Sequence, residues 1–165
     1  MAIIQRDDLP AIRERHKDQR IAFCSGAFDL THAGHILFFE DCKKHGDVLV
    51  VCLGTDALTA QVKGSERPVL NQHIRLKTVA SLKPVDYCYL DSAPLDQPPL
   101  TLLDMTFERL RPDVYVINED ASDIPYRREV SRRFGVELVI LPRWCPPEFE
   151  GISTTKIIEK IKRLP

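Results

Sequence analysis

Short apolar runs alternate with helical stretches along almost the whole chain, and this alternation constrains the fold more than any other feature. The expected strands are at residues 20–25, 47–53, 85–90, 113–117 and 136–141. The expected helices are at 34–45, 71–83, 100–110, 124–134 and 153–163, after a short amphipathic helix at 8–18. Such alternation indicates βαβ units around a parallel sheet, and continuously apolar strands indicate a sheet covered on both faces. The sequence therefore predicts a Rossmann-like α/β fold with an open, parallel, five-stranded sheet and helices on both faces.

Length and composition narrow the class of protein. The 165 residues suffice for one domain with a full core, so we expect a single domain over 1–165 with an N-terminal helical segment at 1–19. The net charge of −1 gives no general attraction to nucleic acid. The five cysteines are odd in number and lack Cys-x-x-Cys spacing, which is typical of buried thiols in a reducing compartment. Neither a signal peptide nor a membrane-spanning run is evident. We expect a cytoplasmic protein with no nucleic-acid or membrane partner.

The segment from Gly26 to His35 carries the strongest chemical signal. It holds two of the five histidines, His32 and His35, with Gly34 between them. It also lies where the first expected strand turns into a helix. A helix N-terminus offers free backbone N–H groups and a positive dipole end, both of which favour phosphate. Two imidazoles at that point can donate hydrogen bonds to phosphoryl oxygens as charge builds up in a transition state.

The histidine pair has two other interpretations. Histidines three residues apart can share a helical face and bind a metal, but no nearby Cys, Asp or Glu completes a metal site of usual spacing. The pair could also be two solvated histidines beside a packing glycine. We expect a phosphate site and no protein-bound metal.

A second signal opens the last expected helix, at Gly151–Lys156. Ser153, Thr154 and Thr155 place three hydroxyls in a row at a helix N-terminus, which is more than one cap needs. The hydroxyls and the backbone N–H groups can jointly hold a phosphate. Capping alone is the alternative.

Two basic residues suit a polyphosphate. Lys63 precedes Gly64 in an expected flexible loop, from which a lysine can swing onto a phosphate as a point charge. Arg75 lies in the next expected helix, and an arginine fork matches phosphate oxygens. Each could instead be a solvated surface residue.

Polar residues follow three of the expected strands. Asp29 directly precedes the histidine turn, so we expect it to face the reacting phosphates. Asp56 follows the second strand, where it can accept a ligand hydroxyl or cap the next helix. Asn118 and Asp120 follow the fourth strand, where they can bind a base or a sugar or form a turn.

Taken together, these residues resemble the cytidylyltransferase-like branch of the His-x-Gly-His nucleotidyltransferases. The match runs through most of the chain in the right order. The matching segments are Gly26–Asp29 with His32–His35, Gly54–Asp56, Lys63–Gly64, Arg75, and Gly151–Ile157.

The resemblance implies an enzyme that joins a nucleoside triphosphate to a phosphorylated alcohol and releases pyrophosphate. His32 and His35 would stabilise the reacting centre, Lys63 would neutralise the triphosphate, and Arg75 would clamp it or the acceptor phosphate. The implied nucleotide-binding residues are Gly26, Ala27, Phe28, Gly34, Ser153, Thr154 and Thr155. The expected substrate-binding residues are Asp29, Asp56, Asn118 and Asp120. Mg²⁺ would be bound through the nucleotide phosphates, and the protein would be a homodimer.

Within the branch, two kinds of enzyme are similar to this chain. Residues 63–69 and 85–87 are similar to heptose-1-phosphate adenylyltransferases, although 117–121 departs from their Lys-Gly-Gly-Asp-Tyr-like segment. Glycerol-3-phosphate cytidylyltransferases carry an arginine close before the second signature, whereas Arg143 here is separated from Gly151 by a proline-rich insertion. The expected donor is therefore CTP or ATP, and the acceptor a sugar or polyol phosphate. A catalytically inactive nucleotide-binding or regulatory protein of the same fold is the alternative.

Overall fold

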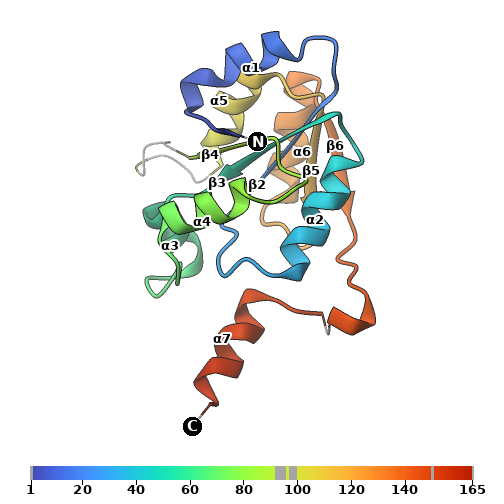
Figure 1. Ribbon diagram of the computed structural model, residues 1–165. Coiled ribbons are helices and arrows are strands. Elements are labelled where there is room, and N and C mark those ends of the chain that lie inside the picture. Colours follow the sequence, from blue (N-terminus) through green and yellow to red (C-terminus); the bar gives the residue numbers. More distant parts are fainter. Residues whose placement is uncertain (1, 92–95, 97–99, 150, 165) are drawn as a thin grey trace.

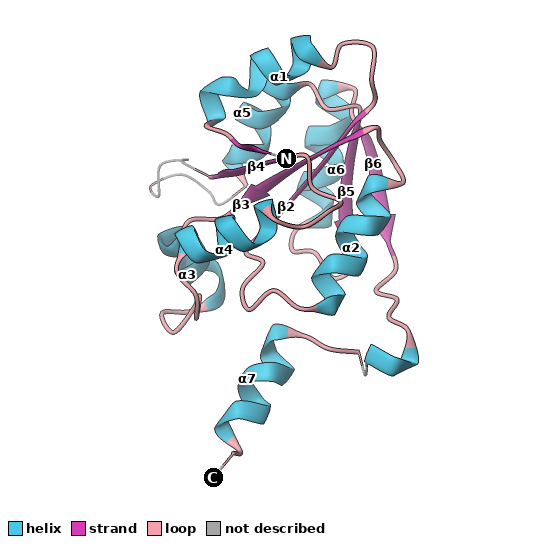
Figure 2. Cartoon of the chain, in the orientation of Figure 1, coloured by secondary structure: helices cyan, strands magenta, loops and turns pink. Residues whose placement is uncertain are grey.

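The computed structural model describes residues 2–91, 96, 100–149 and 151–164. Within these residues, parallel strands form one sheet in the order β1-β4-β3-β2-β5-β6 (Figure 1, Figure 2). The strands are β1 (Ala2–Ile3), β2 (Ile21–Gly26), β3 (Val48–Leu53), β4 (Tyr87–Leu90), β5 (Val114–Asn118) and β6 (Glu137–Leu141). The predicted α/β class and parallel sheet are confirmed, with six strands in place of five. The additional strand, β1, is two residues long and pairs with β4, so it has no periodicity that a sequence pattern could detect.

The helices agree with the prediction apart from one that was not expected. They are α1 (Leu9–Arg15), α2 (Ala33–Lys43), α3 (Asp56–Lys63), α4 (Gln72–Ala80), α5 (Thr101–Leu110), α6 (Ile124–Phe134) and α7 (Thr154–Lys162). The unexpected helix is α3, which begins after the N-cap Thr55 and ends before Gly64. Short 3₁₀ turns lie at Arg6–Asp8 and Pro147–Phe149. The loop expected at 91–99 lies mostly outside the described residues.

Strand side chains alternate between two hydrophobic clusters, one on each face of the sheet. Phe23 and Tyr115 point to the face covered by α1, α5 and α6, and they meet Phe107 there. Cys24 and Val116 point to the opposite face, which α2 and α4 cover. In Figure 1, α1 and α5 lie above the sheet, and α2 and α4 lie below it. Both faces are buried, as continuously apolar strands predict.

The chain reverses its direction across the sheet at β2. It runs from β2 through β3 to β4 on one side, and then crosses to β5 and β6 on the other. In open α/β sheets, ligands bind outside the carboxyl ends of the strands at such a switch point. Figure 1 shows α7 set apart from both helical layers, below them in this view. In the described part of the chain, no helix combines the length and the apolar character that crossing a membrane requires.

Candidate active site

A cavity of about 660 Å³ lies at the carboxyl ends of β2, β3 and β5. This volume falls within the usual range for small-molecule sites, roughly 300–1,000 Å³. All of the predicted nucleotide-binding residues line it: Gly26, Ala27, Phe28, Gly34, Ser153, Thr154 and Thr155. His32, His35, Lys63, Asp29, Asn118 and Asp120 line it as well. Among the predicted site residues, Arg75 and Asp56 do not belong to the lining.

The histidine pair lies at the N-terminus of α2. His32 is the N-cap, and its Nδ1 accepts a hydrogen bond from the N–H of Gly34 over 3.1 Å. The rings of His32 and His35 stack with 4.0 Å between their centroids. A neutral imidazole carries one proton, so the proton of His32 lies on Nε2 when Nδ1 accepts. The ring can therefore donate one hydrogen bond from Nε2.

Burial keeps both histidines neutral. It lowers the pKa of His35 to about 3, and the charges of His32 and Arg143 act in the same direction. Burial also lowers the pKa of His32, again with a contribution from Arg143. The Nδ1 atom of His35 is buried without a hydrogen-bond partner in the described part of the chain. The pair thus presents neutral N–H donors near neutral pH, and one ring nitrogen remains to be satisfied.

The turn that carries the histidines has an unusual backbone. Phe28 and Leu30 have φ angles of 49° and 45°, a region that bulky side chains rarely adopt. The ring of Phe28 packs edge-on against His35 at 5.5 Å and also against Phe39. Packing in the α2 layer therefore holds a turn that local preferences oppose.

Position 34 requires glycine, because other parts of the chain approach its backbone closely. A Cβ at this position would lie 3.1 Å from two ring atoms of His32 and 3.3 Å from the carbonyl oxygen of Ile152. The absence of a side chain lets the start of α2 meet the segment just before α7. Two helix N-termini therefore face the same cavity.

The three hydroxyls at the start of α7 have different surroundings. Ser153 is the N-cap, and its Oγ accepts from the N–H of Lys156 over 3.2 Å. Thr154 donates its hydroxyl to the carbonyl oxygen of Asp29 over 2.9 Å. Thr155 also lines the cavity. One hydroxyl thus caps the helix, as the alternative interpretation expected, and another joins α7 to the histidine turn.

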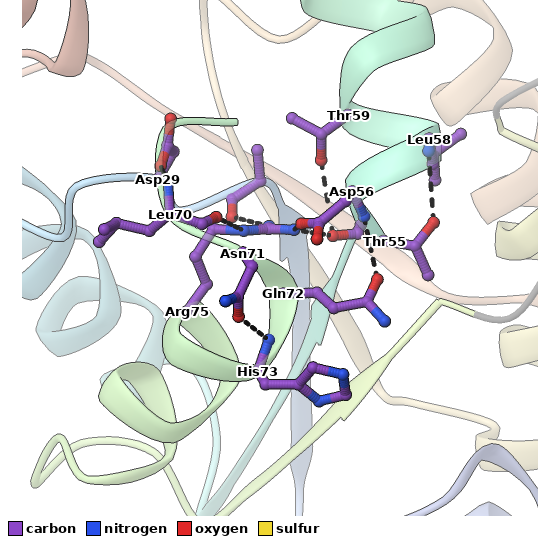
Figure 3. A network of polar contacts seen from close by, with 12 residues as sticks. Asp29, Thr55, Asp56, Leu58, Thr59, Leu70, Asn71, Gln72, His73 and Arg75 are labelled. Carbon is purple, nitrogen blue, oxygen red and sulfur yellow. Dashed lines mark hydrogen bonds and ion pairs between the residues drawn. The ribbon is translucent and has the colours of Figure 1, made fainter. Parts of the chain in front are cut away.

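Arg75 is the centre of a closed polar network beside the cavity (Figure 3). It is fully buried. Its guanidinium donates to the carbonyl oxygens of Leu70, Ala27 and Gly54 over 3.0, 2.6 and 2.8 Å. It also forms an ion pair with Asp56 at 2.8 Å. This differs from the expected phosphate clamp, because the buried fork is directed at protein oxygens and lies outside the cavity lining.

Asp56 and Asp29 also have partners within the chain. Thr55, and not Asp56, caps α3, and the carboxylate of Asp56 faces Arg75. The carboxylate of Asp29 accepts from Arg67 and from the N–H groups of Val69 and Leu70, over 2.8–3.0 Å. Burial by itself would raise the pKa of Asp29, but these hydrogen bonds outweigh it and hold the pKa below its usual value. Both carboxylates are committed to contacts within the chain.

The remaining predicted residues line the cavity, but their local structure differs in part from the expectation. Lys63 is exposed and is the last residue of α3, and therefore not in the expected loop. Asn118 ends β5 and Asp120 follows in a turn, where Asp120 forms an ion pair with Arg143. The segment with Asn118 and Asp120 thus forms a turn and also lines the cavity, so turn formation does not exclude ligand binding.

Sequence reasoning assigned no role to three arginines that line the cavity, Arg67, Arg127 and Arg143. Arg67 pairs with Asp29 and Arg143 with Asp120. Arg127 was detectable, because its spacing from Val130 and Ser131 places it on the buried face of α6. Arg143 reaches the site only because β6 ends beside β5, which local sequence does not reveal.

Comparison with known sequences places the chain in a family. The sequence model of the cytidylyltransferase-like family matches residues 23–160. The bifunctional protein HldE of Helicobacter pylori (strain G27) is 35% identical over 149 residues, which are 90% of this chain and 29% of that protein. HldE of Geobacter sulfurreducens is 36% identical over 151 residues, which are 90% of this chain and 28% of that protein. The chain thus spans under a third of the length of these curated relatives.

Comparison with solved structures agrees. A lipopolysaccharide core biosynthesis protein from Thermoplasma volcanium superposes with a TM-score of 0.59 and 26% identity, over 75% of this chain and 95% of that one. A pantoate-beta-alanine ligase from Francisella tularensis gives a TM-score of 0.66 over 99% of this chain and 78% of that one, at 17% identity, and shares the fold alone. Fold and cavity define an α/β protein of the Rossmann-like class. The chain belongs to the cytidylyltransferase-like family, which confirms the predicted nucleotidyltransferase class.

Proposed function

We propose that this chain transfers a nucleoside monophosphate from CTP or ATP to a phosphorylated sugar or polyol. An oxygen of the acceptor phosphate forms a bond to the α-phosphorus of the triphosphate. The bond between the α-phosphorus and the bridging oxygen breaks, and pyrophosphate leaves with its electron pair. The observation that carries this proposal is the meeting of two helix N-termini, with two neutral imidazoles, at one cavity.

Each residue of the cavity contacts the part of the triphosphate that its position allows. Nε2 of His32 donates to a phosphate oxygen, and His35, which lines the same cavity, contacts the same phosphates. Thr155 and the free N–H groups at the start of α7 bind the β- and γ-phosphates. Lys63 approaches the triphosphate as a cation from the end of α3. Preorganised donors of this kind stabilise charge that develops in a transition state.

Arg75 and Asp29 act through other residues in this proposal. Arg75 binds the carbonyl oxygen of Ala27, and Asp29 fixes the segment that follows α3. The carbonyl oxygen of Asp29 also holds Thr154. The two residues position the histidine turn and α7 relative to each other, and neither needs to touch a substrate.

Mg²⁺ fits the cavity as a partner of the phosphates. In the described part of the chain, no three His, Cys, Asp or Glu side chains gather as a metal-binding group. Two of the carboxylates that line the cavity, Asp29 and Asp120, are already paired with arginines. Mg²⁺ commonly keeps several waters and binds substrate phosphates with one or two carboxylates. The ion would neutralise charge on the triphosphate, and Asp41, a third carboxylate of the lining, is likewise paired, with Lys44.

The sugar-phosphate acceptor is supported by similarity. The 63–69 segment is similar to the heptose-1-phosphate enzymes, and the relatives include HldE and a lipopolysaccharide core biosynthesis protein. We propose that residues 1–165 act as one catalytic domain, because the family match spans 23–160. The homodimer stays a prediction that sedimentation would test.

A pyrophosphate-release assay tests the proposal. CTP, ATP, GTP and UTP are each combined with heptose 1-phosphate, glycerol 3-phosphate and phosphocholine, in the presence of Mg²⁺. We expect release with CTP or ATP and a sugar or polyol phosphate, and little with the other triphosphates. Binding of triphosphates in a thermal-shift assay without any turnover would favour the inactive nucleotide-binding protein.

A further inference from the structure

Arg127 is a buried cation in the wall of the cavity. It lies in the second turn of α6, which begins after the N-cap Asp123, and it is only 8% exposed. Its Nε donates to the carbonyl oxygen of Ser122 over 2.6 Å, and a terminal nitrogen lies 3.5 Å from the hydroxyl of Ser122. The other terminal nitrogen donates to the hydroxyl of Tyr115, and the guanidinium lies 5.9 Å from the centroid of that ring.

Each of these partners is neutral. Among the described residues, no carboxylate oxygen lies within 4.0 Å of the guanidinium. An arginine keeps its positive charge in proteins, and its fork carries five N–H donors, of which these contacts use three. Burying a charge is costly unless it is paired and hydrogen-bonded. When a ligand fills the cavity and displaces water, the countercharge for Arg127 must come from that ligand.

Arg127 and the histidines lie on different sides of the same strand ends. Tyr115 belongs to the hydrophobic cluster that α1, α5 and α6 cover, and its hydroxyl lies 3.4 Å from Oγ of Ser25. Ser25 directly precedes Gly26 at the end of β2. The histidines instead begin α2, which covers the opposite face. The cavity wall therefore carries a cation on the α6 side, separate from the helix N-termini of α2 and α7.

We propose that Arg127 binds the phosphate of the acceptor, and that the acceptor is a phosphorylated sugar or polyol and not a cationic alcohol phosphate such as phosphocholine. The inference rests on the proposed nucleotidyl transfer and deepens it. From the α6 side, the acceptor phosphate reaches the α-phosphorus opposite the histidines, with its charge balanced by the fork of Arg127.

Two other polar groups of the cavity suit the hydroxyls of such an acceptor. Asp91 is buried, directly follows β4 and lines the same cavity. Ser25 lines it from the end of β2. A carboxylate accepts charge-assisted hydrogen bonds from hydroxyls, and a serine hydroxyl both donates and accepts. None of these three side chains is aromatic, as a choline cage would require.

The test compares Arg127→Met and Arg127→Lys with the exposed neighbour variant Arg128→Met. Isothermal titration measures the binding of heptose 1-phosphate and phosphocholine, with a non-hydrolysable CTP or ATP analogue present. Steady-state kinetics measure KM for the acceptor and for the triphosphate. We expect Arg127→Met to weaken heptose 1-phosphate at least tenfold, with KM for the triphosphate changed less than twofold. The affinity of Arg127→Lys for heptose 1-phosphate should lie between those of Arg127→Met and the unmodified protein. The affinity of Arg128→Met should equal that of the unmodified protein.

Several outcomes would overturn the inference. An unchanged acceptor affinity in both Arg127 variants contradicts it, as does an equal loss for acceptor and triphosphate, which would indicate a purely structural role. If Arg127→Met does not fold, Arg127→Lys decides, because it keeps the charge and loses only the fork. Preference for phosphocholine in the unmodified protein also overturns it, while nucleotidyl transfer stands. Conversely, the protein could bind a sugar phosphate through Arg127 and release no pyrophosphate. That result would contradict the proposed function but support the acceptor site at Arg127.

Discussion

The chain holds two buried arginines near its cavity, and their surroundings differ in one decisive way. Arg75 is bound by three carbonyl oxygens and the carboxylate of Asp56, and it lies outside the cavity lining. Arg127 has only neutral partners in the described residues, and it lines the cavity. A buried charge therefore marks a binding site only when the protein leaves it without a countercharge. A charge that the protein satisfies itself belongs to the scaffold.

The same contrast extends to the regions around the two arginines. The closed network of Figure 3 joins Arg75 and Asp56 to α3 and α4 by bonds within the chain. The open wall consists of His32, His35, Lys63 and Arg127, whose polar groups are incompletely satisfied by the described residues. Substitutions in the closed network should reduce stability, and those in the open wall should reduce activity.

Arg75→Met should give the largest effect, on stability. It leaves the carboxylate of Asp56 without its cation and removes the donors to three carbonyl oxygens. The side chain of Asp56 is 42% exposed, so the loss comes mainly from the carbonyl oxygens, each of which costs about 1–3 kcal/mol of unfolding free energy when it is left buried without a donor. Urea denaturation measures the loss, with the exposed Lys77→Met on the same helix as the control. Asp56→Asn should lower the unfolding free energy less, because the amide oxygen can still accept a hydrogen bond from Arg75. Unchanged stability with lost turnover would move Arg75 into the active site.

His35→Ala should act on catalysis. Removing one donor aimed at developing charge costs about 2.7–4 kcal/mol, or about 10²–10³ in kcat. His32→Ala should behave similarly, since its Nε2 is the donor that the bond to Gly34 fixes. The control is His73→Ala, an exposed histidine on α4. Circular dichroism should show folded variants. Near-normal turnover in both would refute the catalytic assignment of the pair.

Lys63→Ala should lower activity with no change in melting temperature. The side chain is exposed at the last position of α3, and no packing depends on it. A hydrogen bond to a charged group is worth roughly 1.5–3 kcal/mol, so kcat/KM should fall about tenfold to a hundredfold. Lys83→Ala, exposed and away from the cavity, is the control. A lower melting temperature with full activity would place Lys63 in the scaffold.

The last prediction concerns the pH dependence of stability. In the unfolded chain the pKa of His35 is near 6.5, and in the folded protein it is about 3. Between these values the unfolded state binds a proton that the folded state does not. Stability is therefore fully present above about pH 6.5 and is lost as the pH falls toward 3, by at most about 1.4 kcal/mol per pH unit.

Urea denaturation between pH 7 and pH 5 measures this loss. The lowered pKa of Asp29 acts below that range, because its unfolded value is 3.8. His35→Gln lacks the titrating ring, so its stability should vary less with pH. Parallel pH profiles for the two proteins would show that His35 is not held neutral by burial.

The sequence determined the parts of this protein that depend on local pattern. Strand and helix alternation gave the parallel α/β sheet, because apolar periodicity decides which faces are buried. The His32–His35 turn and the Ser153–Thr155 segment were recognisable as helix starts, because an N-terminus exposes its donors whatever surrounds it. Helix α3 was not predicted, because only one of its eight residues is buried and a single buried residue gives no apolar periodicity.

The tertiary structure decided which charges are free to act. Local sequence made Arg75 and Asp56 plausible ligand contacts, but the packing of α3 beside α4 directs them at each other and at carbonyl oxygens. Arg127 has neutral partners, because Tyr115 of β5 and Ser122 of the turn before α6 are the groups that its fork meets in the described residues. Pairing depends on groups far apart in the chain, and a charged residue shows the same letter in the sequence whether its partner is the protein or a substrate.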